Sequence, residues 1–147
     1  MTPKEVVQKS YEAFGTGDME TLASLSHEDM IVKVNGMMSI SGEYKGFEDF
    51  LHNMLARLPV LFSNFKVEPK KMFAEDGNVF TICEISGDGF SFTSCHYTLV
   101  EGEKFKEFHV FDDTQKLAHS IFALGARGVR SRGASGRAGA VPRLLRI

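Results

Sequence analysis

Three side chains are capable of acid–base or hydrogen-bond chemistry: Tyr11, Asp112 and His96, of which His96 lies among apolar neighbours in the middle of a predicted strand. An imidazole titrates near neutral pH, so His96 could act on a ligand in a pocket, or could be a core histidine satisfied by a backbone or hydroxyl partner. Asp112 could instead cap a following helix. Tyr11 is typical of a helix-packing aromatic whose hydroxyl could reach a pocket mouth. The residues alone leave these alternatives open.

Other chemistries find little support in the sequence. No two histidines share a metal-ligand spacing, so we expect no metal site. No glycine-rich phosphate loop and no G-x-S-x-G motif occurs, and we therefore expect neither a cofactor nor nucleophilic catalysis. Cys83 and Cys95 lack a C-x-x-C spacing and are predicted to be buried, reduced thiols.

The length of 147 residues suits one domain, and 43% hydrophobic with 24% charged residues is typical of a globular protein. No apolar run approaches the roughly 18 residues of a membrane-spanning helix. The N-terminus has no signal-peptide pattern either, so we expect a cytoplasmic protein without a membrane partner.

Charge divides the chain into a domain, residues 1–124, and a tail, residues 125–147. The domain carries 11 basic and 19 acidic side chains, a net charge of −8, whereas the tail carries six arginines and no acid. The acidic domain argues against nucleic acid as a partner. We interpret the Arg/Gly-rich tail as disordered or non-native; a nucleic-acid-binding arm and a cationic segment that folds back on the domain are the alternatives.

Capping signals and apolar spacing predict the helices. The Thr-Pro-Lys-Glu run at residues 2–5 predicts the start of a first helix that ends at Gly15. Asp18 predicts the cap of a second, shorter helix. A wide apolar stripe predicts a third helix over 47–58, and a last helical segment is expected over 114–124.

The remaining pattern predicts an α+β domain. A short strand is expected at 30–34, and consecutive antiparallel strands over 62–74, 79–86, 90–100 and 105–112. Parity along the strands places on one face, the face of a ligand cavity, Phe80, Ile82, Phe92, Ser94, His96 and Thr98. The opposite face, with Thr81, Cys83, Thr93, Cys95 and Tyr97, would suit a dimer. In 105–112 either the odd- or the even-numbered residues could face inward, and a bulge would reconcile the two.

The order of the motifs resembles a known family. The motifs are YEAF at 11–14, GDMETL at 17–22, EDMIV at 28–32, GEYKG at 42–46 and the aromatic-rich stretch 103–112. Together they resemble the NTF2-like superfamily, and within it the SnoaL-like and ketosteroid-isomerase-like proteins. The resemblance implies a cone of three N-terminal helices packed on a strongly curved, mostly antiparallel sheet, with a pocket in its open end and a homodimer formed through the sheet.

The resemblance also indicates which catalytic residues of the family have counterparts in this chain. The position that holds the carboxylate base in the isomerases aligns with Val34 or Asn35. Neither residue can act as that base, so a steroid-isomerase mechanism is not expected. The tyrosine position on the first helix aligns with Ser10, next to Tyr11, and the second donor position falls on or near His96. Cyclase-type members use an acidic residue on the last strand of the pocket, where His109 and Asp112 are the candidates here.

The sequence therefore predicts a protein that binds a small hydrophobic molecule, with proton-transfer chemistry of the isomerase or cyclase type. A non-catalytic dimerisation or ligand-sensing domain is the alternative. The predicted catalytic residues are His96 and Asp112. The predicted ligand-binding residues are Tyr11, Phe14, Val34, Met54, Phe92 and His109.

Overall fold

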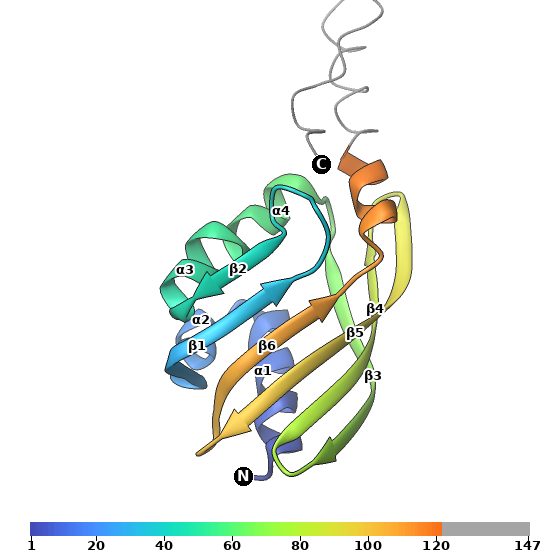
Figure 1. Cartoon of the computed structure of the whole chain (residues 1–147). Coiled ribbons are helices and arrows are strands. Elements are labelled where there is room, and N and C mark those ends of the chain that lie inside the picture. Colours follow the sequence, from blue (N-terminus) through green and yellow to red (C-terminus); the bar gives the residue numbers. More distant parts are fainter. Residues whose placement is uncertain (122–147) are drawn as a thin grey trace, which may run out of the picture.

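Residues 1–121, the part of the chain that the computed structural model describes, form a bent sheet with helices on its concave side (Figure 1). In this part of the chain six strands pair in the order β2-β1-β6-β5-β4-β3. All neighbouring pairs are antiparallel except β1 with β6, which are parallel. The strands are β1 Ser26–Val34, β2 Gly42–Lys45, β3 Lys66–Glu75, β4 Asn78–Gly87, β5 Phe90–Glu101 and β6 Lys104–Phe111. The predicted α+β fold with a mostly antiparallel sheet is confirmed.

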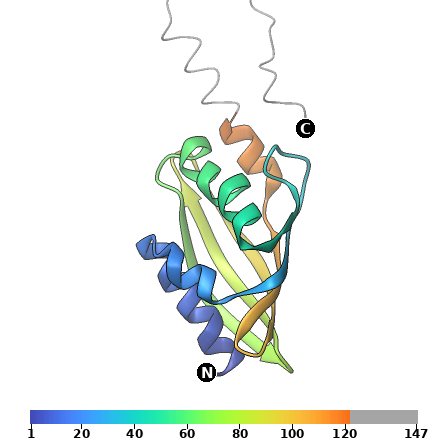
Figure 2. The same ribbon diagram turned by 90° about the vertical axis from the view of Figure 1, so that its left-hand side faces the viewer.

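Helix α1 (Pro3–Thr16) lies across the concave face of the sheet (Figure 2). Its start is a capping box: the Thr2 hydroxyl accepts a hydrogen bond from the Glu5 amide, and the Glu5 carboxylate accepts one from the Thr2 amide. The helix continues past the predicted end at Gly15, because it is Gly17 that adopts the left-handed conformation, with φ of 72°. Helix α2 (Met19–Ser24) begins at the predicted Asp18 cap.

The predicted third helix is interrupted. Helix α3 (Gly46–Asn53) ends where Met54 leaves helical geometry, with φ of −129° and ψ of −64°, and a 3-10 turn η1 (Leu55–Arg57) follows. A short helix α4 (Leu58–Leu61) then begins with Pro59 in its first turn, so that this proline starts a helix rather than ending one. The break turns both Met54 and Leu58 into the core, where they are 6% and 5% exposed.

The predicted face of β5 is confirmed and the predicted face of β4 is wrong. Phe92, Ser94, His96 and Thr98 are buried on the concave side, but so are Thr81 and Cys83 of β4, whereas Phe80 is 46% exposed. The two-residue turn after Gly87 sets a register in which odd-numbered residues of β4 stand opposite even-numbered residues of β5, with Thr81 opposite His96. Directly opposed residues share a face, so β4 presents its odd-numbered residues to the core.

A bulge in β6 decides which of its residues face inward. Leu99 pairs with Glu107 and Val100 with Phe105, which leaves Lys106 as the extra residue. Phe105 before the bulge and Phe108 and Val110 after it consequently share the concave side. Odd-numbered residues of β6 therefore face inward before the bulge, and even-numbered residues face inward after it.

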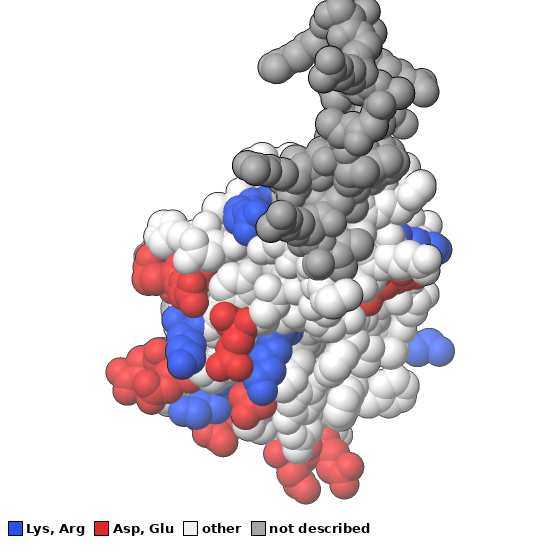
Figure 3. All heavy atoms as spheres, turned by 45° about the horizontal axis from the view of Figure 1, so that its top comes forward, with Lys and Arg blue, Asp and Glu red and all other residues white. Residues whose placement is uncertain are grey.

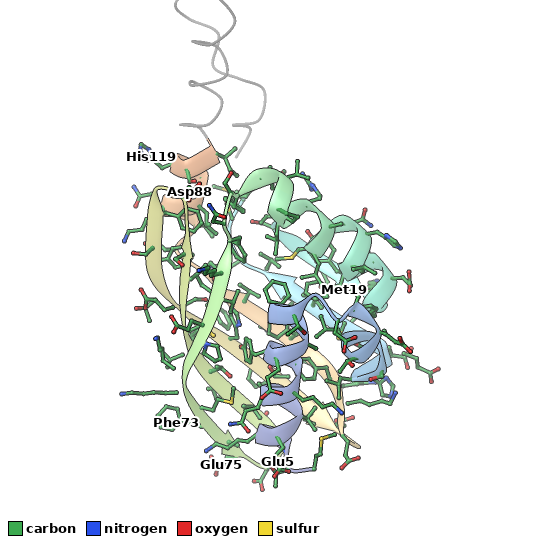
Figure 4. All side chains as sticks on the ribbon, turned by 180° about the vertical axis from the view of Figure 1, so that it is seen from behind. Glu5, Met19, Phe73, Glu75, Asp88 and His119 are labelled. Carbon is green, nitrogen blue, oxygen red and sulfur yellow. The ribbon has the colours of Figure 1, made fainter. Side chains whose placement is uncertain are left out.

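The last described helical residues, 114–121, cross the end of the sheet. Asp113 accepts a hydrogen bond from the Lys116 amide, which caps this segment, and Leu117 is 1% exposed. His119 of this segment and Asp88 of the β4–β5 turn lie at the same end of the molecule (Figure 4). No helix in residues 1–121 has the length and apolar character needed to span a membrane. The predicted tail, 125–147, lies outside the described residues, as do residues 122–124 of the predicted last helix.

Candidate functional site

A cavity of about 100 Å³ lies between the concave face of the sheet and helices α1 and α3. Figure 4 shows α1 crossing in front of the strands with side chains filling the space between the layers. The walls are mainly aromatic and aliphatic, with Phe14, Phe50 and Met54 among them. The polar residues that line the cavity are few: Ser10, Tyr11, Ser26, His96, Thr98 and Asp112. An apolar cavity with a few convergent polar groups is the usual form of a small-molecule site.

The first polar group in the cavity wall joins α1 to the sheet. The Tyr11 hydroxyl lies 2.8 Å from Nδ1 of His96. The Cys83 thiol lies 3.5 Å from the Tyr11 oxygen and 3.7 Å from the same imidazole nitrogen. The tyrosine and imidazole planes are inclined by only 15°, and the edge of the imidazole meets the Phe108 ring at 84°. The imidazole is therefore held in one orientation by contacts from three elements.

Burial keeps this group uncharged. It lowers the pKa of His96 to about 4, so the imidazole is neutral at neutral pH. Burial also raises the pKa of the Cys83 thiol to about 11 and raises the pKa of the Tyr11 hydroxyl. Neither Cys83 nor Tyr11 is consequently an anionic nucleophile, and the group can act only through hydrogen bonds.

The second polar group surrounds Asp112 at the end of β6. One carboxylate oxygen accepts a hydrogen bond of 2.5 Å from the Ser94 hydroxyl. The side-chain amide of Asn35 donates to the Asp112 carbonyl and accepts from the Asp112 amide, each at 3.0 Å. Burial raises the pKa of Asp112, and the hydrogen bond from Ser94 works in the opposite direction. The carboxyl is thus fixed in position and brought closer to the range in which it can exchange a proton near neutral pH.

The two groups share one wall of the cavity. His96 of β5 is paired with Val110 of β6. Asp112, which Ser94 hydrogen-bonds, follows Val110 by two residues and is therefore the next residue on the same face. Diagonal positions of this kind on neighbouring strands are about 7–8 Å apart. A small molecule lying on this wall would therefore contact the imidazole and the carboxyl together.

Thr98 adds an unsatisfied polar atom to the cavity wall. It is fully buried, it lies two residues beyond His96 on the same face of β5, and its hydroxyl has no hydrogen-bond partner among residues 1–121. An unpaired buried hydroxyl costs about 1–3 kcal/mol. A water molecule or a ligand in the cavity would remove that cost.

The structure brings five of the eight predicted site residues to the cavity: Tyr11, Phe14, Met54, His96 and Asp112. Val34 and Phe92 are buried in the adjoining core and are not among the residues that line the cavity. His109 lies on the convex face, where its ring is 5.3 Å from that of Tyr97. The bulge in β6 turns His109 away from the cavity, so the ligand site proposed below does not include it.

Four polar residues that the sequence did not assign to the site support it. Cys83 contacts Tyr11, Ser94 contacts Asp112, Asn35 clamps Asp112, and Thr98 lines the cavity. Strand parity had placed Ser94 and Thr98 on the cavity face, although neither was among the predicted catalytic or ligand-binding residues. Cys83 and Asn35 had no comparable signal, because their positions depend on register.

A metal site finds no support in the described part of the chain, where no three His, Cys, Asp or Glu side chains converge. The cavity offers an imidazole whose Nδ1 is already hydrogen-bonded and one carboxyl already bonded to Ser94. Such a donor set suits hydrogen bonding and proton transfer.

Comparison with known proteins agrees with this fold. The SnoaL-like domain family matches residues 7–108, and the chain belongs to that family. No match was found among curated proteins.

The fold is also similar to that of solved structures. An NTF2-like protein from Burkholderia thailandensis is 20% identical, with a TM-score of 0.76 over 82% of this chain and 98% of that chain. TerC, crystallised with polyporic acid, is 19% identical, with a TM-score of 0.72 over 82% and 98%. A protein from Catenulispora acidiphila with a ketosteroid isomerase-like fold, crystallised with trimethylamine, is 16% identical, with a TM-score of 0.67 over 80% and 92%. Identities this low show the shared fold alone.

Proposed function

We propose that this protein binds a small hydrophobic molecule in the cavity and transfers a proton on it with Asp112 and His96. The observation that carries the proposal is the placement of one carboxyl and one imidazole on the same wall of a mainly apolar cavity. The relatives crystallised with polyporic acid and with trimethylamine support small-molecule binding by this fold.

Each residue has a distinct part in the proposed reaction. Asp112, in its ionised form, removes a proton from a carbon next to a ligand carbonyl, and the C–H electron pair moves onto the oxygen. His96 hydrogen-bonds that oxygen and stabilises the negative charge that develops there. Asp112 then returns the proton to the same or to another carbon, so no cofactor or co-reactant is needed.

Deuterium exchange tests this function with the full chain. Small cyclic ketones incubated with the protein in D₂O should gain deuterium at the carbon next to the carbonyl, as measured by mass spectrometry. Asp112→Asn keeps the shape of the side chain and should lower the exchange rate by about 100-fold or more. Asp113→Asn, which retains an oxygen for the Lys116 amide, is the matched control and should exchange like the wild type.

A non-catalytic homodimer is the second candidate, favoured by an aromatic row on the convex face. Across four neighbouring strands, Phe73 pairs with Phe80, Phe80 with Tyr97, and Tyr97 with His109. Phe73 and Phe80 are 60% and 46% exposed. Figure 3 shows charged side chains gathered on one side of the molecule and a largely uncharged surface beside them. A stable dimer in solution without any proton exchange would favour this candidate.

A further inference from the structure

The Tyr11 hydroxyl is committed to a neighbouring side chain. Its oxygen lies 2.8 Å from Nδ1 of His96, and the plane of its ring is nearly parallel to that of the imidazole. A phenolic hydroxyl has a single proton to donate. If that proton goes to Nδ1, Tyr11 has none left for a ligand, and its effect on the cavity must pass through His96.

We propose that Tyr11 is a positioning residue that fixes His96 as the Nε2–H tautomer, so that the cavity selects an uncharged, one-ring molecule whose oxygen accepts a hydrogen bond from Nε2. This inference rests on the proposed function, because it names the ligand class of the same cavity. It also makes a statement about His96 that holds without any ligand.

The tautomer follows from the groups around Nδ1. Both polar groups that approach this nitrogen, the Tyr11 hydroxyl and the Cys83 thiol, carry a proton, because burial raises the pKa of each. A neutral imidazole has one N–H and one acceptor nitrogen. The Cys83 thiol donates to the Tyr11 oxygen, so the Tyr11 proton is directed to Nδ1, that nitrogen is the acceptor, and the proton of the ring resides on Nε2.

The Nε2–H group is the one available to a ligand. Within residues 1–121 the side-chain hydrogen bonds of His96 all involve Nδ1, and His96 lines the cavity. The Phe108 ring packs against the imidazole at 84° and prevents the ring from turning freely. A ligand that offers only a donor at this place would meet another donor and be rejected.

The size of the cavity and the charge of its lining residues restrict the ligand class further. An apolar cavity of about 150 Å³ binds benzene, and the cavity here is about 100 Å³. The ligand is therefore no larger than a single ring, and a fused four-ring molecule does not fit. No lysine or arginine of the described residues lines the cavity, so a charged ligand would lose its hydration without gaining a partner of opposite charge.

Nitrogen NMR of the full chain tests the tautomer first. The ¹⁵N signals of a histidine ring distinguish a protonated from an unprotonated nitrogen, and we expect His96 to show the proton on Nε2. Tyr11→Phe should give a mixture of both tautomers. Tyr97→Phe is the matched control, because its hydroxyl bonds Asn78 elsewhere in the molecule, and it should leave the His96 signals unchanged.

Binding of three probes by NMR titration tests the ligand class. 2-Cyclohexenone should bind, 1-methylcyclohexene should bind about tenfold more weakly because it lacks the oxygen, and progesterone should not enter the cavity. Tyr11→Phe should weaken only the binding of 2-cyclohexenone. His96→Gln keeps an N–H near the place of Nε2 and should retain more of that binding than His96→Leu, which keeps none.

Several results would overturn the inference. A proton on Nδ1 in the wild type contradicts the proposed tautomer, whether or not a ligand binds. Because this measurement uses the wild type, it tests the tautomer even if Tyr11→Phe fails to fold. Equal affinity for the ketone and the hydrocarbon contradicts the hydrogen bond from Nε2. Binding of progesterone without binding of 2-cyclohexenone contradicts the ligand class but leaves the proposed function standing, whereas binding of none of the probes overturns both.

Discussion

Asn35 and Asp112 are 77 residues apart in sequence and are joined by two hydrogen bonds of 3.0 Å, one in each direction between the side-chain amide and the backbone. The pair stands where the parallel strands β1 and β6 end together. Asn35 is one of the two positions at which the resemblance to the isomerases would place a carboxylate base. In this chain the residue instead holds the backbone of the carboxylate that enters the cavity.

Asn35→Ala should therefore destabilise the fold and impair the site. The change removes both hydrogen bonds and leaves the amide and carbonyl of Asp112 unpaired, which should lower the free energy of unfolding by about 1–3 kcal/mol. Urea denaturation measures this loss. Asn53→Ala is the control, because Asn53 is exposed on α3 and its side-chain amide donates to the neighbouring Asp49 carboxylate. Equal losses in the two variants would show that the clamp contributes nothing beyond an ordinary surface contact.

His96 should make the fold sensitive to acid. Its pKa falls from the ordinary value of 6.5 to about 4 in the folded state, so between these values the unfolded chain binds more protons. The contribution of His96 to the free energy of unfolding therefore has its full value above pH 6.5, and it declines by about 3 kcal/mol as the pH falls to about 4. The measurement is the free energy of unfolding from pH 4 to 7, with His96→Gln beside the wild type.

The difference between wild type and His96→Gln isolates this contribution from that of other groups. It should grow in favour of the wild type as the pH rises from 4 to 6.5 and be constant above. A flat difference for His96→Gln would contradict the buried, neutral state of the imidazole.

Asp112 should affect stability in the opposite direction. Burial raises its pKa above the ordinary value of 3.8, so just above this value the folded state binds more protons than the unfolded state. Stability then falls as the pH rises through the window between the two values. Asp112→Asn cannot ionise, and its stability relative to the wild type should increase from pH 4 to 7. An increase in favour of the wild type over the same range would contradict this sign.

The sequence predicted those parts of the site that depend on local signals. The capping box at Thr2, the apolar stripe of α1 and the alternation of β5 placed Tyr11, Phe14 and His96 on their elements. Asp112 was found through the resemblance to the cyclase-type proteins. These features depend on helical spacing, strand parity or motif order, all of which can be seen in the amino-acid sequence.

The remaining features depend on register, which local sequence does not specify. The inverted face of β4 follows from the length of one turn, and the outward position of His109 follows from one extra residue, Lys106. The contact of Tyr11 with His96 joins residues 85 positions apart. Each of these arrangements requires the relative placement of two elements, so no pattern within either element could reveal it.

Thr98→Val should stabilise the unliganded protein. Valine matches the shape of threonine and removes a fully buried hydroxyl that has no partner among residues 1–121, so the free energy of unfolding should rise by about 1 kcal/mol. Thermal or urea denaturation measures the gain. Thr93→Val, at an exposed position of the same strand where the hydroxyl bonds Glu84, is the control and should not stabilise. A loss of stability in Thr98→Val would indicate that an ordered water satisfies the hydroxyl.

The convex aromatic row predicts dimerisation through the sheet. Phe80 and Phe111 are 46% and 50% exposed beside Tyr97 and His109, and a carboxylate at either phenylalanine would be buried without a partner in a sheet-to-sheet interface. The full chain should therefore be a dimer that Phe80→Glu or Phe111→Glu converts into a monomer, as measured by light scattering during gel filtration. Val60→Glu is the matched control, because Val60 is 81% exposed on α4, away from the convex face, and the dimer should persist. A wild-type monomer at micromolar concentration, or a dimer that survives both phenylalanine substitutions, would contradict an interface on this face.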